Sequence, residues 1–171
     1  MPASTTSSAS TTAISSIHFC LIAPNRLSVI PFLSLILPYL NYYKYLANAC
    51  KLPLYLYNFP IITKIEIYPE TVKQLAAHPN IWGIKDSSNN IEYLKKLLAL
   101  DLKSPFNWLL GSEAILCDSL AMGAHGGVNS GANLFPKLYA KSYDIFRNGT
   151  SQQKATFQKL INQVGSIAVS Y

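Results

Sequence analysis

The sequence predicts an α/β fold whose strands run parallel. Four strand candidates begin near Leu54, Ile81, Phe106 and Gly126, at intervals of about 20 to 27 residues. Amphipathic stretches and turn signals lie between them, and this alternation of strand and helix is typical of parallel βα units. We therefore expect about four such units in a row.

The first two strands are apolar segments that contain side chains of a reactive type. Residues 54–60 include Tyr57, and residues 81–88 include Lys85. An amine at the end of an apolar strand lies in a low-dielectric setting, which favours the neutral nucleophile that attacks carbonyls. A tyrosine at the end of the preceding strand can donate and accept protons for it. Position alone also fits a solvated strand-end lysine and a packed core tyrosine.

Helices are predicted after both of these strands. Pro69 suits the first turn of a helix over residues 69–78, with Val72 and Leu75 on one face. Residues 86–90 are rich in N-cap side chains and lead into a helix over residues 91–98. Lys85 is therefore expected at a strand-to-helix junction.

Two further units complete the series. Residues 106–110 form the third strand candidate, and a helix over about residues 114–122 follows. Glu113 is expected to cap this helix, and contact with a polar substrate tail is the alternative. The fourth unit begins at residues 126–133, whose glycines and small polar residues permit close backbone approach to a ligand. Two helices are then predicted over residues 135–147 and 151–164, separated by Asn148 and Gly149, a usual helix stop.

Several short motifs follow one another along the chain. They are Tyr57-Asn58-Phe59-Pro60, Thr63, Pro69-Glu70-Thr71, Gly83-Ile84-Lys85-Asp86-Ser87-Ser88, Gly111-Ser112-Glu113 and Gly123-Ala124-His125-Gly126-Gly127-Val128. In order and spacing this set resembles the dihydrodipicolinate synthase and N-acetylneuraminate lyase family, over roughly residues 41–165. The resemblance implies a (β/α)8 barrel and class I aldolase chemistry, in which a lysine forms a Schiff base with a 2-oxo acid such as pyruvate.

The resemblance also implies roles for individual residues. Lys85 matches the Schiff-base lysine, and Tyr57 matches the tyrosine that shuttles protons. Val128 and Asn129 lie in the segment that matches the loop at the last barrel strand, and with Thr63 they are expected to bind the substrate. The protonated imine is itself the electron sink for breaking a carbon–carbon bond, so we expect no cofactor. Barrel active sites lie at the C-terminal ends of the strands, where these residues are placed.

The length of the chain departs from the family pattern. It has 171 residues, whereas a barrel of this kind takes about 250. We therefore expect a partial barrel, the C-terminal half, from a fragment or an altered gene product. No Gly-Thr-Thr-Gly-Glu type loop, which would bind the substrate carboxylate, precedes Tyr57. The alternative to an active aldolase is thus an inactive family member that acts, if at all, by association with another barrel chain.

The segment after Tyr57 bears on the substrate. Synthases of the lysine pathway usually have an arginine after the Tyr-Asn-x-Pro motif, where this chain has Ile61-Ile62-Thr63. The only arginines are Arg26 and Arg147, so a bidentate clamp on a dicarboxylic product is not expected. A 2-keto-3-deoxy acid or a sialic-acid-like substrate is favoured over dihydrodipicolinate synthesis.

The N-terminal part is predicted to differ from the rest. We expect residues 1–40 to be a low-complexity and apolar segment outside the family domain, and residues 41–171 to form that domain. Residues 2–16, mostly Ser, Thr and Ala without charge, are expected to be disordered. The apolar run 27–40 has 14 residues, fewer than the roughly 18 of a membrane-spanning helix. We expect a cytoplasmic protein, with organellar targeting by the Ser/Thr-rich start as the alternative.

Charge and cysteine content exclude other classes. The net charge of +6 does not indicate nucleic-acid binding, because the lysines are scattered and Lys95-Lys96 is the only adjacent pair, which fits a solvated helix face. Cys20, Cys50 and Cys117 lack the spacing of a metal site, so we expect no metal, no disulfide and a buried thiol at Cys117. The expected partners are a small 2-oxo acid and a second copy of the chain.

Overall fold

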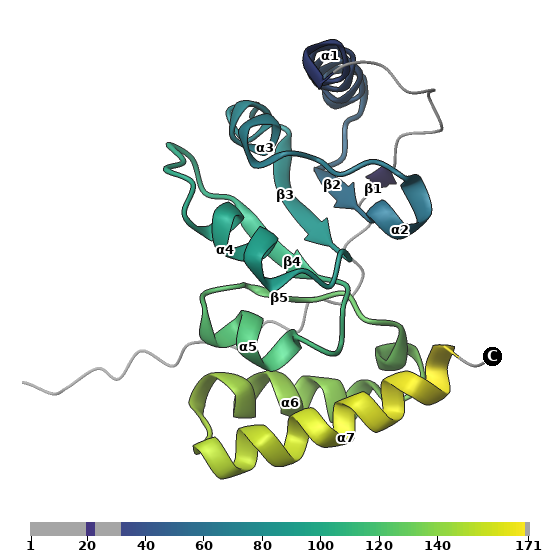
Figure 1. Cartoon of the computed structure of the whole chain (residues 1–171), viewed down its shortest axis with the longest axis vertical. Coiled ribbons are helices and arrows are strands. Elements are labelled where there is room, and N and C mark those ends of the chain that lie inside the picture. Colours follow the sequence, from purple (N-terminus) through teal and green to yellow (C-terminus); the bar gives the residue numbers. More distant parts are fainter. Residues whose placement is uncertain (1–19, 23–31, 170–171) are drawn as a thin grey trace, which may run out of the picture.

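The computed structural model describes residues 20–22 and 32–169, and strands alternate with helices through most of this range (Figure 1). In chain order the elements are β1 (Cys20–Ile22), α1 (Phe32–Ala49), β2 (Leu54–Asn58), α2 (Pro60–Thr63), α3 (Pro69–Leu75), β3 (Ile81–Asp86), α4 (Ile91–Leu98), β4 (Asn107–Leu110), α5 (Leu116–Ala121), β5 (Gly126–Gly127), a 3-10 turn η1 (Ser130–Asn133), α6 (Pro136–Asn148) and α7 (Ser151–Val169). The predicted disorder of residues 2–16 concerns a stretch outside the described residues.

The strands form one sheet in the order β1-β2-β3-β4-β5, and every neighbouring pair is parallel. Each strand therefore lies beside the next strand in the sequence, as expected for consecutive βα units. Figure 1 shows α1, α3, α4 and α5 following the sheet in the same order, with α6 and α7 side by side beyond β5. The structure confirms the predicted α/β fold with parallel strands.

The two faces of the sheet differ in burial. Successive side chains of a strand point to opposite faces. One face is buried, through Leu54, Leu56, Ile84, Trp108 and Leu110. On the other face the alternate residues are half-buried, and we call it the inner face: Tyr55, Tyr57, Lys85, Asn107 and Leu109. Parallel sheets normally have both faces covered, so the partial exposure of the inner-face side chains is unusual.

The buried residues form two apolar clusters. The first joins α1, α3 and α4 to the strands and includes the fully buried Tyr43, Leu54 and Leu75. The second joins α5, α6 and α7 to the end of β4 and includes Leu110, Phe146 and Ile161. Burial of each such side chain contributes about 1.5–3 kcal/mol. These contacts fix the helices that follow each strand, and hence the loops at the strand ends.

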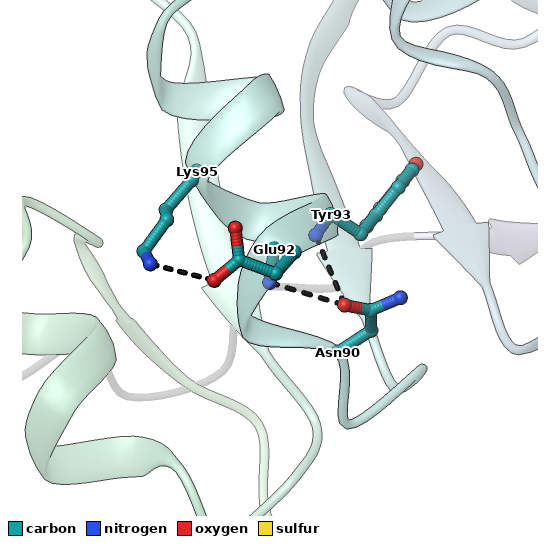
Figure 2. A network of polar contacts seen from close by, with 4 residues as sticks. All are labelled: Asn90, Glu92, Tyr93 and Lys95. Atoms are coloured by element: carbon teal, nitrogen blue, oxygen red, sulfur yellow. Dashed lines mark hydrogen bonds and ion pairs between the residues drawn. The ribbon is translucent and has the colours of Figure 1, made fainter.

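Helix α4 begins where the sequence predicts it (Figure 2). Asn90 is its N-cap, and the side-chain Oδ1 accepts hydrogen bonds from the backbone N–H groups of Glu92 (3.0 Å) and Tyr93 (3.1 Å). A cap of this kind stabilises a helix by about 1 kcal/mol. Lys95 donates to Glu92 over 2.6 Å, but both side chains are exposed, so the pair contributes little. Lys96 is exposed as well, which confirms the solvated face predicted for the lysine pair.

Other elements were not predicted. Helix α1 contains Pro38, although proline lacks the N–H of an internal helix bond and usually ends a helix. The strand β1 has three residues, and α2 is a single turn whose C-cap residue, Lys64, has a φ of 62°. The predicted division of the chain after residue 40 falls within α1 and stays a prediction. Across the described ranges, no helix combines the length and apolarity needed to cross a bilayer.

The ends of β2 and β3 are joined through their buried side. Asn58 Nδ2 donates to Asp86 Oδ1 over 2.8 Å, and Asn58 Oδ1 accepts from the backbone N–H of Ile67 over 3.0 Å. Asp86 also accepts from the N–H of Ser88 (3.0 Å) and from its hydroxyl (2.9 Å). Burial raises the pKa of Asp86, and these hydrogen bonds oppose that rise. A buried carboxyl group thus depends on Asn58 for one of its donors.

The substitution Asn58→Ala should therefore lower the free energy of unfolding by about 3 kcal/mol, because it removes one of the donors to the buried Asp86 carboxyl group and leaves the Ile67 N–H without its acceptor. Urea unfolding followed by circular dichroism measures this loss. The exposed Asn148 at the end of α6 provides the matched control, since Asn148→Ala should change stability by less than about 0.5 kcal/mol. Equal losses of unfolding free energy in the two variants would show that the buried Asn58–Asp86 hydrogen bond does not stabilise the fold.

Candidate active site

Tyr57 and Lys85 are brought together by the sheet. They are paired residues in the register of β2 and β3, so both side chains lie on the inner face. Lys85 Nζ lies 4.9 Å from the centre of the Tyr57 ring, a distance at which an ammonium is attracted to the π face. Phe59 continues the aromatic group, with its ring centre 5.8 Å from that of Tyr57. The two predicted catalytic residues are therefore neighbours.

The setting of Lys85 changes its acidity. Burial lowers the pKa of Lys85 from the ordinary lysine value of 10.5, because a low-dielectric environment disfavours the ammonium form. The apolar strand around Lys85 predicted this direction. More of the neutral amine is then present near neutral pH than for a solvated lysine, and the neutral amine is the form that attacks carbonyl carbon.

A glycine at the end of β4 makes room for Lys85. A Cβ atom at Gly111 would lie 2.9 Å from Cε of Lys85 and would overlap the hydroxyl of Ser87. The backbone of residue 111 therefore passes directly beside the lysine side chain, which requires glycine. The Gly111-Ser112-Glu113 motif was noted in the sequence, but its contact with Lys85 was not predicted. The signal was a glycine directly after an apolar strand.

The loop after β5 is hydrogen-bonded to the end of β4, beside Gly111. The Val128 N–H donates to the Leu110 carbonyl over 2.8 Å. Asn129 is buried, and its Nδ2 donates to the Gly111 carbonyl over 3.2 Å. Because Gly111 contacts Lys85, these bonds bring Val128 and Asn129 to the neighbourhood of the lysine. Their predicted contact with a substrate stays a prediction.

Thr63 occupies a different position. It ends α2, and its hydroxyl lies 3.0 Å from the Phe59 carbonyl and 2.9 Å from the Ile65 carbonyl. A hydroxyl has one proton, so it donates to one of these oxygens at a time. Its hydrogen bonds stay within its own loop and do not reach the Lys85 pair. A role in binding substrate stays a prediction for Thr63.

The cap predicted for Glu113 is wrong. Helix α5 begins at Leu116, its N-cap is Ile115, and no side chain caps it. The Glu113 carboxylate instead accepts a hydrogen bond from the backbone N–H of Gly131, at 2.8 Å. A contact across 18 residues of sequence is tertiary, and a capping pattern cannot reveal it.

Metal ligands do not gather at this site. In residues 20–22 and 32–169, no group of three or more His, Cys, Asp and Glu side chains has the arrangement of a metal site. Cys117 is a free thiol on α5, and burial raises its pKa, which confirms the predicted buried thiol. The chemistry that the described side chains support is that of an amine and a phenol.

Comparison with known proteins identifies the family. The sequence profile of the Dihydrodipicolinate synthetase family matches residues 27–170. The 4-hydroxy-tetrahydrodipicolinate synthase of Teredinibacter turnerae is 37% identical over 128 residues, which cover 70% of this chain and 44% of that protein. A protein of Escherichia coli named "Probable 2-dehydro-3-deoxy-D-pentonate aldolase" is 32% identical over 130 residues, 74% of this chain and 43% of that protein.

Solved structures agree with the sequence comparison. A dihydrodipicolinate synthase from Acinetobacter baumannii, complexed with pyruvate, superposes with a TM-score of 0.72 at 28% identity, covering 80% of this chain and 46% of that one. The βα units described above thus form part of a (β/α)8 barrel, as predicted. This chain spans a little under half the length of the relatives that it matches. With its fold, its motifs and its sequence in agreement, the chain belongs to the dihydrodipicolinate synthetase family.

Proposed function

We propose that this chain is a class I aldolase or lyase in which Lys85 forms a Schiff base with a 2-oxo acid such as pyruvate. The observation that supports this most strongly is the pairing of Lys85, whose pKa is lowered, with Tyr57 at 4.9 Å on the inner face of the sheet. Membership of the family and the pyruvate complex of the Acinetobacter baumannii relative agree with it.

The chemistry needs one amine and a route for protons. The neutral amine of Lys85 attacks the C2 carbonyl carbon, the carbonyl oxygen leaves as water, and a protonated imine remains. Loss of a C3 proton, or cleavage of the C3–C4 bond, moves an electron pair into the imine and gives an enamine. In the synthetic direction the enamine carbon attacks an aldehyde, and hydrolysis of the imine then releases the product and Lys85.

Tyr57 is proposed to move the protons in these steps. The centre of its ring lies 4.9 Å from Lys85 Nζ, and Tyr57 is the residue paired with Lys85 in the register of β2 and β3. A positioned acid or base of this kind contributes about 10²–10⁴-fold to a rate. Val128, Asn129 and Thr63 are proposed to border the bound substrate.

The substrate is proposed to be a 2-keto-3-deoxy acid or a sialic-acid-like acid. Helix α2, which directly follows β2, has two exposed isoleucines, Ile61 and Ile62, at 62% and 66%. The one arginine among the described residues, Arg147, lies on α6 and donates to the Ala124 carbonyl. A second carboxylate would thus find no guanidinium on α2. The name of the Escherichia coli relative fits this class, whereas that of the Teredinibacter turnerae relative fits dipicolinate synthesis.

A second function is favoured by the inner face of the sheet. Tyr55, Tyr57 and Leu109 are half-buried there, and β1 and β5 are the edges of the described sheet. Uncovered parallel sheets and open edges pair readily with further chains. We infer that the chain associates through this face and these edges with another barrel chain, for which a second copy is the simplest partner. If the chain does not catalyse the aldolase reaction, association with another barrel chain is its proposed function.

Incubation with pyruvate and sodium borohydride should leave a reduced pyruvyl adduct on Lys85, located by peptide mass spectrometry. Lys85→Ala should abolish the adduct, and Tyr57→Phe should slow its formation about 100-fold, because the amine and the proton relay are lost in turn. Lys96→Ala on the exposed face of α4 is the control and should react like the parent chain. A folded sample without an adduct at Lys85 would refute the imine and leave association as the remaining function.

Light scattering coupled to size-exclusion chromatography should give a mass of about twice 18.9 kDa. Leu109→Asp places a charge on the inner face and should shift the chain toward the monomer. Leu160→Asp is the matched control, because Leu160 is an exposed leucine of α7. A folded, monodisperse monomer, or equal dissociation of both variants, would contradict association through the inner face.

A further inference from the structure

We propose that Glu113 is a positioning residue, which holds the loop over residues 127–133 against the end of β4 and so keeps the surroundings of Lys85 in a binding-competent arrangement. The proposal rests on the proposed function for its effect on pyruvate. Its structural part concerns the loop and helix α7, which contact Glu113, and helix α6, which packs against the loop.

The contact with the loop is direct. Oε1 of Glu113 accepts the backbone N–H of Gly131 over 2.8 Å. Hydrogen bonds from a backbone N–H to a carboxylate are charge-assisted and stronger than neutral ones. Gly131 itself is buried and packs against the Tyr139 side chain of α6. The loop is therefore enclosed between Glu113 and α6 at this residue.

Helix α7 encloses Glu113 from another direction. A Cβ atom at Gly165 would overlap Oε2 of Glu113, so the helix backbone lies directly on the carboxylate. Gln158, two turns earlier on α7, donates to the Glu113 carbonyl over 2.9 Å and accepts from the Cys117 N–H over 2.9 Å. These contacts restrict the rotamers of Glu113, and α7 thereby fixes the direction in which the carboxylate points.

The loop has a second attachment nearer to Lys85. Asn129 donates to the Gly111 carbonyl over 3.2 Å, and Gly111 lies beside Cε of Lys85. Glu113 and Asn129 thus attach both parts of the loop to residues 111–113. Without Glu113, the hydrogen bonds of Val128 and Asn129 and the packing of Gly131 against α6 remain, but the Gly131 side of the loop loses its hydrogen bond to residues 111–113 and can shift. Small displacements of a binding loop lower the occupancy of the reactive geometry.

Hydrogen–deuterium exchange tests the attachment itself. Glu113→Ala should speed exchange of the Gly131 amide about tenfold, because its acceptor is gone. Glu113→Gln retains an oxygen at the same position but loses the charge, so its Gly131 exchange should lie between that of the parent chain and that of Glu113→Ala. Glu92→Ala on α4 is the matched control, because Glu92 is exposed and its side chain bonds to Lys95 (Figure 2).

A substitution on α7 tests the same contact from the other side. Gly165→Ala adds a methyl group that would overlap the Glu113 carboxylate, and it should speed Gly131 exchange in the same way. Alanine is the better helix former, so a weaker helix cannot be the cause of the loosening.

Borohydride trapping then separates positioning from a general loss of folding. In Glu113→Ala the pyruvate concentration for half-maximal trapping should rise about tenfold, with the amount of trapped protein at saturation unchanged. A purely structural role would lower the amount trapped and leave the half-maximal concentration unchanged, which would overturn the proposal. Unchanged Gly131 exchange in Glu113→Ala would overturn it as well.

Failure of the proposed function would look different. A parent chain that forms no adduct would refute the imine, and with it any effect of Glu113 on pyruvate. The exchange rate of the Gly131 amide would still decide whether Glu113 holds the loop.

Discussion

The register between β2 and β3 is the constraint on which the site depends. Tyr57 faces Lys85 on the inner face only because the next residues along the strands, Asn58 and Asp86, face each other on the buried side. A slip of one residue would exchange the two faces and bury the lysine beneath the helices. The hydrogen bond between Asn58 and Asp86 specifies the pairing, since two buried polar groups are satisfied in this register. Fold and chemistry are therefore fixed by neighbouring residues of the same two strands.

The remaining features shape the space around one amine. Burial lowers the pKa of Lys85, Gly111 leaves room for its side chain, and the loop after β5 is hydrogen-bonded to the backbone of Gly111. These are local effects at the C-terminal ends of parallel strands, where helices, loops and backbone groups converge. They require βα units packed in order, which the two apolar clusters provide.

Periodic patterns and punctuation in the sequence predicted most of the fold. The helices α3, α4, α6 and α7 were expected close to their observed bounds because proline starts, N-cap residues and apolar spacing mark them. Helix α1 was missed because Pro38 was interpreted as an interruption. The Lys85 and Tyr57 pair could be proposed from strand ends and motifs. The position of Glu113 could not, because its partners Gly131 and Gly165 are distant in sequence and contact it only through tertiary packing.

The claim that unites these observations is that the sheet holds Lys85 as an amine of lowered pKa. Its most direct test is a pH titration of the chain with ¹³C at the lysine Cε positions, followed by NMR, with the Lys85 signal assigned by its loss in Lys85→Met. A titration midpoint below the ordinary lysine value of 10.5 is the result that the structure predicts. A midpoint at or above 10.5 would contradict it, because the side chain would then be solvated or paired with a negative charge.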